Sequence, residues 1–308
     1  AFAFESAVAG GIPVIGALTR GLAANEVNWI AGIINGTSNY ILSEMAENGR
    51  SFAAALLQAQ ELGYAEADPT FDVGGIDAAH KLTILAALAF GMSMRFADVF
   101  IEGIEALGLE DIEYAQQLGY RIRHLGIARR SAKGIELRVH PTLIPQQQLL
   151  ASVAGVMNAV MVNSDAAGDT LYYGAGAGAG PTASAVVADL IEIAAGGAQR
   201  GSIAGEGSSL DVIPVEQTQS GFYLNIPSLD QPGVFARAAT ILSDHNISID
   251  AVIQKEHASQ ADTDQPWVPI VILTHPVSEG VMNAAIAELQ AMPEVVDTIK
   301  RIRVEHFV

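Results

Sequence analysis

The 308-residue sequence contains no cysteine. Disulfides, thiolate nucleophiles and cysteine-ligated zinc are therefore excluded, and the absence fits a reducing compartment. Positive charge is also scarce, since 16 Lys and Arg stand against 34 Asp and Glu, for a formal net charge of −18. Nucleic acids and anionic membranes bind basic surfaces. Neither is therefore expected as a partner.

Long apolar runs are absent as well. No run reaches the roughly 18–20 uninterrupted residues of a membrane span. The first residues, AFAFESAVAGGIPVIGAL, contain Glu5 and lack the basic region that opens a signal peptide. We therefore expect a cytoplasmic protein. Half of its residues are hydrophobic, which is enough to bury a sizeable core in two domains.

The first domain is expected over residues 1–195, where helical and strand-like patterns alternate. Gly49 and Gly63 follow two of the helical patterns and are typical helix ends. The patterns predict helices at residues 38–48, 53–62, 76–90, 111–125 and 181–194, and strands at residues 1–4, 27–34, 126–130, 134–141, 153–162 and 170–173.

A second domain is expected over residues 221–308. Residues 196–220 are rich in Gly, Ser and Gln and show little periodicity, which is typical of a linker. From residue 221 the patterns follow the order βαββαβ, the split-βαβ arrangement of a ferredoxin-like domain. The chain as a whole is therefore expected to be an α+β protein.

The stretch GYAEADPTFDVGGIDAAHK, residues 63–81, places several acids around Lys81. Asp77 and Lys81 are four residues apart and share one face of a helix. One interpretation is an ordinary exposed ion pair, which contributes about 0.3–0.5 kcal/mol. However, Lys81 opens the apolar run LTILAALAF, where a buried lysine needs carboxylate partners or loses its proton. A half-buried lysine of this kind can give and take a proton, so both interpretations stay open.

This stretch resembles the signature of the homoserine dehydrogenase family. Four other blocks carry the same resemblance in order: ESAVAGGIP at residues 5–13, GIINGTSNYIL at 32–42, GYRIRHLGIARR at 119–130 and YYGAGAGAGPTASAVVADL at 172–190. The resemblance implies NAD- or NADP-dependent oxidation of L-homoserine to L-aspartate 4-semialdehyde, and the reverse reaction, on the route to threonine, methionine and isoleucine. It also implies that residues 1–195 form a mixed sheet with helices on one face.

The family's residue roles can be carried over by position. The resemblance implies that Lys81 donates and accepts the proton, with Asp77 as a carboxylate at the substrate end. It implies that Glu66 binds homoserine through its ammonium group. The other implied positions are Tyr64, Asp72 and Thr37 in the substrate pocket, and Gly63 and Gly178 beside the cofactor.

The glycine-rich run GAGAGAG follows a strand-like segment and precedes a helix. It is nevertheless a poor Rossmann fingerprint, because no βαβ unit with an acid about 20 residues further on follows it. Homoserine dehydrogenases begin with a Rossmann domain of their own that carries GxGxxG and a second active-site lysine. No segment here matches that domain. We therefore expect the chain to be part of a longer enzyme.

The block ESAVAGGIP has two open interpretations. The resemblance implies a monovalent cation site, usually for sodium, formed mostly by backbone oxygens of Glu5, Val8, Gly10 and Ile12. Oxygen ligands suit a hard cation. The alternative is a Gly-Gly-Pro turn that ends a strand.

The segment LDQPGVFARAATILSDHNISID, residues 229–250, resembles an ACT domain, with Asp230, Pro232 and Gly233 in its first turn. ACT domains pair edge to edge and bind amino acids, so threonine is expected as an effector and a homodimer or homotetramer as the assembly. Alternatively, the domain serves only dimerisation. A non-enzymatic amino-acid-binding regulator is the alternative for the whole chain. The intact Glu66, Asp77 and Lys81 favour the enzyme.

Overall fold

The structure is a computed structural model that describes residues 2–196, 210–254 and 267–307. The chain divides into two compact units, Ala1–Pro141 with Gln146–Pro214 and Thr142–Pro145 with Val215–Val308. Most of the predicted linker, residues 197–209, lies outside the described residues. Among the described residues, no helix combines the length and the apolar character needed to cross a bilayer.

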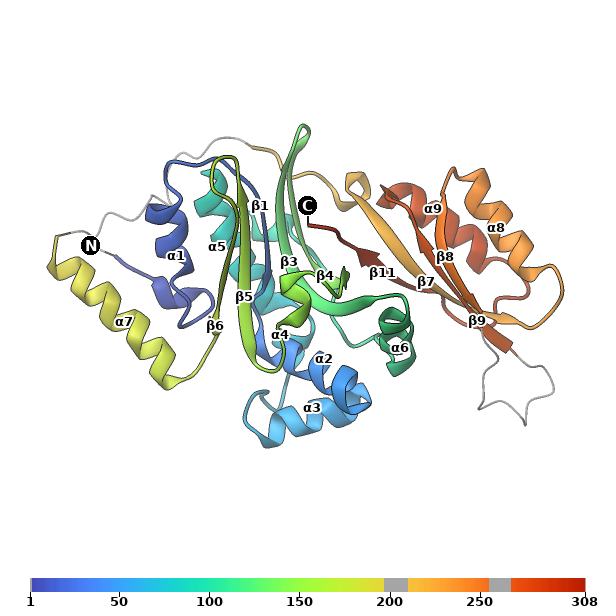
Figure 1. Ribbon diagram of the computed structural model, residues 1–308, viewed down its shortest axis with the longest axis horizontal. Coiled ribbons are helices and arrows are strands. Elements are labelled where there is room, and N and C mark those ends of the chain that lie inside the picture. Colours follow the sequence, from blue (N-terminus) through green and yellow to red (C-terminus); the bar gives the residue numbers. More distant parts are fainter. Residues whose placement is uncertain (1, 197–209, 255–266, 308) are drawn as a thin grey trace. The chain divides into compact units, whose positions relative to one another are not determined.

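The first unit is built on a mixed sheet (Figure 1). Antiparallel pairing joins β1 to β3 and β5, and β5 to β6, while the two-residue β2 runs parallel to β4. The strand order is β6 (Gly168–Ala175), β5 (Met157–Ser164), β1 (Val27–Ile33), β3 (Tyr120–Ser131) and β4 (Gly134–Pro145), with β2 (Phe100–Ile101) beside β4. The predicted mixed sheet is confirmed.

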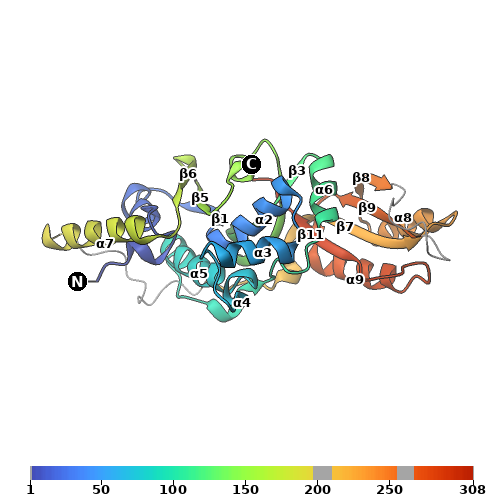
Figure 2. The same cartoon turned by 90° about the horizontal axis from the view of Figure 1, so that it is seen from below.

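Helices cover this sheet and supply its core. The helices of the unit are α1 (Val14–Gly16), α2 (Gly36–Asn48), α3 (Phe52–Glu61), α4 (Thr70–Val73), α5 (Ile76–Phe90), α6 (Leu109–Gln117) and α7 (Ala179–Ala194). Both α2 and α5 pack on the strands, and Figure 2 shows α3, α4 and α5 gathered on one side of them. Leu82 and Leu85 of α5 pack with Ile30, Ala128 and Val160 in one apolar cluster.

The predicted helix 76–90 matches α5 at both ends. Two other predictions are wrong. The helix expected at 111–125 ends at Gln117, because Gly119 adopts φ +85° and β3 begins at Tyr120. The strand expected at 1–4 does not form over the described residues 2–4, where Phe2 is 77% exposed and a 3₁₀ helix begins at Glu5.

The second unit has the predicted βαββαβ order. Its elements are β7 (Gln219–Leu229), α8 (Val234–Asp244), β8 (Ile249–Gln254), β9 (Trp267–Thr274), the short β10 (Val277–Ser278), α9 (Glu279–Gln290) and β11 (Lys300–Val304). The four main strands lie in the order β11-β7-β9-β8 and are antiparallel. Phe222, Leu224, Ile272, Met282 and Leu289 join the sheet to the two helices in one core.

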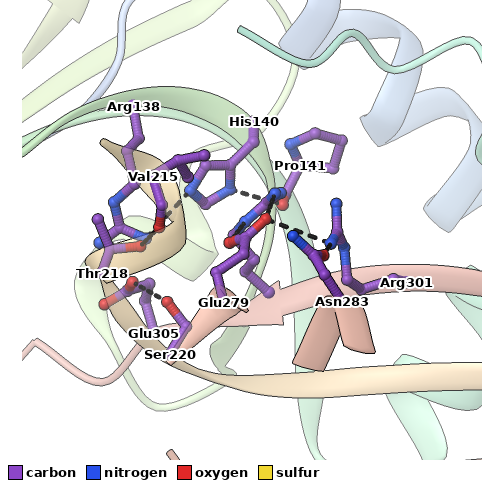
Figure 3. Close-up of polar contacts among 11 residues, drawn as sticks. Arg138, His140, Pro141, Val215, Thr218, Ser220, Glu279, Asn283, Arg301 and Glu305 are labelled. Atoms are coloured by element: carbon purple, nitrogen blue, oxygen red, sulfur yellow. Dashed lines mark hydrogen bonds and ion pairs between the residues drawn. The ribbon is translucent and has the colours of Figure 1, made fainter. Parts of the chain in front are cut away.

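An ion cluster ties β11 to the start of α9. Arg303 is fully buried, and its Nε donates to Oε2 of the buried Glu279 at 2.7 Å. Arg301 contacts the same carboxylate at 3.2 Å and donates to Asn283 (Figure 3). Because Glu279 lies in the first turn of α9, its charge also suits the positive end of the helix dipole. On the neighbouring β7, the Ser220 hydroxyl donates to Glu305 at 3.0 Å.

Candidate active site

A cavity of about 550 Å³ lies in the first unit. It is lined by the start of α2, the loop after α3, parts of α4 and α5, the start of β5 and the glycine-rich segment after β6. Segments far apart in the sequence therefore meet here, and most of them contribute polar groups. The cavity is the natural place to look for the chemistry of this unit.

Lys81 reaches this cavity from the second turn of α5. Its Nζ lies 2.7 Å from Oδ2 of Asp77 and donates to the carbonyl oxygen of Ile34 at 3.0 Å. The side chains of Lys81 and Asp77 are 21% and 22% exposed. The ion pair is therefore half-buried, and the charge of Lys81 is held at a fixed place on the cavity wall.

Asn35 joins the two aspartates of the site. It caps α2, because its Oδ1 accepts from the backbone N–H of Ser38 at 2.8 Å. Its Nδ2 donates to Oδ1 of Asp72 at 2.7 Å and to Oδ2 of Asp77 at 2.8 Å. Asn35 was not among the residues predicted from the sequence. An asparagine before a helical pattern indicates a helix cap, but it does not indicate which side chains the amide contacts.

The first turn of α2 also fixes two loops. The Thr37 hydroxyl donates to the carbonyl oxygen of Tyr64 at 2.6 Å, and the Ser38 hydroxyl donates to that of Asp72 at 3.0 Å. The Tyr64 ring packs edge-on against Tyr40 with 5.0 Å between centroids. Thr37 is therefore buried as a support for the Tyr64 loop as well as lining the cavity. On the same loop, the exposed Glu66 lines the cavity.

The glycine-rich segment after β6 also lines the cavity. Gly178 has φ +109° and immediately precedes α7, and Gly63, which lines the cavity from the loop after α3, has φ +75°. At Gly176 an added Cβ would lie 2.1 Å from Nδ2 of Asn158, so the Asn158 amide lies directly against this backbone. Asn158 is 1% exposed and was also missed by the sequence analysis.

The ESAVAGGIP block lies beside the glycine-rich segment. Gly11 N–H donates to the carbonyl oxygen of Ala175 at 3.0 Å, and a Cβ on Gly10 would meet the Gly176 oxygen at 2.4 Å. The Glu5 carboxylate is buried and accepts from the N–H groups of Ile15 and Gly16 at 2.8 and 2.9 Å. It therefore stabilises the start of α1.

The part of the chain that the structure describes contains no group of three or more His, Asp or Glu side chains arranged to hold a metal ion. The side chains of Val8 and Ile12 are buried and apolar. At these two positions, a cation could therefore be bound only by backbone oxygens.

Comparison with known proteins identifies the family. The homoserine dehydrogenase family profile matches residues 13–191, and the ACT domain profile matches residues 223–294. A homoserine dehydrogenase from Pseudomonas aeruginosa is 55% identical, in an alignment that covers 98% of this chain and 71% of that protein. The chain belongs to the homoserine dehydrogenase family. A homoserine dehydrogenase from Neisseria gonorrhoeae is 54% identical over 98% of this chain and 70% of its own length.

A solved homoserine dehydrogenase structure agrees with this assignment. The crystal structure of the Thiobacillus denitrificans enzyme matches with a TM-score of 0.90 and 53% identity, covering 98% of this chain and 69% of that one. The function of the chain is therefore that of a homoserine dehydrogenase, an oxidoreductase of amino-acid biosynthesis that uses NAD(P). The alternative of a non-enzymatic regulator is not favoured.

The cavity of this homoserine dehydrogenase brings together eight residues that the sequence analysis selected: Thr37, Gly63, Tyr64, Glu66, Asp72, Asp77, Lys81 and Gly178. The four positions selected for a cation, Glu5, Val8, Gly10 and Ile12, do not line this cavity. They belong to the adjoining turn.

Proposed function

We propose that Lys81 transfers the proton when L-homoserine and L-aspartate 4-semialdehyde are interconverted. Oxidation removes a hydride from the carbinol carbon and a proton from its hydroxyl group. A neutral amine within hydrogen-bond distance of that hydroxyl can accept the proton, and an ammonium can return it in the reverse direction. The observation that carries this proposal is the position of Nζ, 2.7 Å from Asp77 on the wall of the cavity.

Asp77 has a supporting role in this proposal. Its carboxylate and the Ile34 carbonyl accept from Lys81, so the amine is held in one direction by two acceptors. A fixed direction reduces the entropy lost when the substrate oxygen meets the amine. Asp77 also completes the negative end of the cavity with Asp72.

For the substrate, we propose that Glu66 binds the ammonium group of homoserine, with Asp72, Tyr64 and Thr37 completing the pocket. Glu66 and Tyr64 are exposed on one short loop that Thr37 holds in place. A carboxylate on the rim of a cavity attracts an ammonium group. The zwitterionic substrate would therefore be oriented with its hydroxyl end toward Lys81.

The cofactor, NADP or NAD, would lie against Gly63 and Gly178. It supplies the hydride acceptor in oxidation and the hydride donor in reduction. A Cβ on Gly63 would meet no heavy atom within 4 Å, and one on Gly178 would meet only Pro181, from 3.6 Å. The backbone at both glycines is therefore open for close approach by a planar ring. A hyperthermophilic archaeal homoserine dehydrogenase has been solved in complex with NADPH, at 27% identity and a TM-score of 0.53, covering 62% of this chain and 55% of that one.

We further propose a monovalent cation, sodium, bound by backbone oxygens of Glu5, Val8, Gly10 and Ile12. The tight turn at Ala9 and Gly10, with φ of +54° and +42°, supports it because such turns converge carbonyl groups. Thermal unfolding in sodium chloride and in choline chloride at equal ionic strength tests it. We expect a higher melting temperature in sodium, and identical curves would contradict the site.

Residues 221–308 are proposed as an ACT domain that binds threonine and assembles the enzyme as a homodimer or homotetramer, with residues 1–195 as the catalytic domain and 196–220 as the linker. Gly233, with φ +90°, forms the turn before α8, where the proposed effector site lies. Replacing Gly233 with Asp should weaken threonine inhibition. Unchanged inhibition would count against this site. We place the enzyme in the cytoplasm, because a chain without cysteine suits a reducing compartment.

The Lys81→Ala substitution tests the catalytic proposal. Loss of proton transfer should lower kcat by about 10²–10⁴-fold. Lys133→Ala is the matched control, because Lys133 is an exposed lysine in the turn between β3 and β4 and does not line the cavity. A Lys81→Ala enzyme with kcat within about twofold of the wild type would overturn the proposal.

A further inference from the structure

Asn35 is 6% exposed, and its carboxamide has hydrogen-bond partners on both its oxygen and its nitrogen. One side accepts the Ser38 N–H at 2.8 Å. The other side donates to two carboxylates, Asp72 on α4 at 2.7 Å and Asp77 on α5 at 2.8 Å. One nitrogen therefore uses both of its hydrogens on two like charges.

Only one orientation of this amide satisfies all of these partners. If oxygen and nitrogen were exchanged, the amide oxygen would face two carboxylates and the amide nitrogen would face a backbone N–H. Both contacts would then be repulsive. The helix cap thus aims the NH₂ group at the aspartates. The end of β1, the start of α2 and the site are coupled through one side chain.

We propose that Asn35 is a positioning residue that holds Asp72 and Asp77 together and keeps Asp77 on Lys81. This inference rests on the proposed role of Lys81. Two neighbouring carboxylates repel each other, and a neutral donor that bonds both of them holds them side by side. Oδ2 of Asp77 is the same atom that accepts from Lys81, at 2.7 Å. A shift of this oxygen would move the amine.

Among the described residues, the titratable groups that line the cavity with this cluster come from three segments. Asp72 is on α4, Asp77 and Lys81 are on α5, and Tyr64 and Glu66 are on the loop after α3. The cluster is acidic apart from Lys81. An added negative charge at position 35 would therefore favour the protonated amine and oppose its action as a base.

Asn35→Asp is the decisive variant. It keeps a capping oxygen of equal quality and nearly the same shape, but it loses both donors and adds a carboxylate. We expect kcat for homoserine oxidation at neutral pH to fall at least about tenfold. The acidic limb of its pH–rate profile should move to higher pH, because the new carboxylate adds negative charge beside the amine. Serine is also a good helix cap but carries no charge, so Asn35→Ser should lower kcat with a smaller movement of the acidic limb. If Asn35→Asp does not fold, Asn35→Ser tests the positioning role in its place.

Ser51→Ala is the matched control for loss of a helix cap. Ser51 caps α3 through the Ala54 N–H at 3.3 Å and does not line the cavity. It should lower the melting temperature without changing the pH profile. If the Asn35 variants keep the wild-type kcat and an unmoved acidic limb while Lys81→Ala is inactive, the inference about Asn35 is overturned and the proposed function is not. An active Lys81→Ala enzyme would overturn the proposed function and the inference together.

Discussion

The Lys81 amine and the Asp77 carboxylate lie 2.7 Å apart, one helical turn from each other. The spacing alone is common on exposed helices, where such a pair contributes little. Here both side chains are about one-fifth exposed, and Asp77 is also held by Asn35. The pair is therefore part of a larger polar cluster with a defined geometry.

The first prediction concerns Asp77→Asn. The substitution removes a negative charge 2.7 Å from the amine, so the acidic limb of the pH–rate profile for oxidation should move to lower pH. Because the amine also loses a fixed acceptor, kcat should fall about tenfold or more. The measurement is kcat across pH 6–10. Asp68→Asn is the control, since Asp68 is exposed, accepts hydrogen bonds from Thr70 and does not line the cavity. An unmoved limb would contradict the expectation.

The second prediction concerns His124, which is buried in β3 and bonds the carbonyl oxygen of Glu102 through Nε2 at 3.0 Å. Burial lowers the pKa of His124 from 6.5 to about 4. Between these values the unfolded chain binds a proton that the folded protein excludes. The contribution of neutral His124 to the free energy of unfolding is therefore fully present above about pH 6.5. It is lost as the pH falls toward 4.

The loss should reach about 3 kcal/mol by pH 4. Urea unfolding at several pH values measures it. His124→Gln keeps a donor but does not titrate, so its stability should depend less on pH over this range. Parallel pH dependence in the variant and the wild type would show that other groups cause the effect.

The third prediction concerns Gly176→Ala. The new Cβ would lie 2.1 Å from Nδ2 and 2.2 Å from Cγ of Asn158. These contacts are too short, so the residues must move apart. We expect a loss of about 1–3 kcal/mol in stability, together with lower activity, because the segment lines the cavity. Gly21→Ala is the control, since a Cβ there meets nothing within 4 Å. The double variant Gly176→Ala/Asn158→Ala should recover part of the stability. If it recovers none, the contact with Asn158 is not the cause of the loss.

The fourth prediction concerns the buried cluster of the second unit. Glu279→Gln removes the negative charge beside Arg303, which is fully buried, and should destabilise the protein by about 3–5 kcal/mol. Glu288→Gln is the comparison, because Glu288 is 56% exposed and pairs with His245 at the surface. Its effect should stay below about 1 kcal/mol. Chemical unfolding measures both stability losses. If the two substitutions destabilise the protein equally, burial does not explain the effect of Glu279→Gln.

Local patterns predicted the elements that local forces determine. The apolar run after Lys81 predicted α5, and Gly49, at φ +63°, ends α2 as expected. The helix predicted through residue 125 failed because its apolar residues also suit a buried strand. Residues 120–125 instead form the first half of β3, the strand whose second half pairs with β1, as between Ala31 and Ile127.

The candidate site was predicted in part. Eight selected residues line one cavity, and family resemblance rather than periodicity selected most of them. Asn35 and Asn158 were missed, because the sequence around an asparagine does not indicate which groups its side-chain amide will contact. Asn35 and Asp72 are 37 residues apart, and Asn158 lies against Gly176 only because β5 and β6 pair.

The sequence by itself determined the spacing of Asp77 and Lys81, the end of α2 at Gly49 and the βαββαβ order of the second unit, because helix periodicity, capping and strand alternation act over a few residues. The tertiary structure decided that one amide joins Asp72 to Asp77 and that Thr37 supports the Tyr64 loop. It also decided that His124 and Arg303 are buried. These relationships depend on how distant segments pack, and packing is set by the whole core rather than by any local pattern.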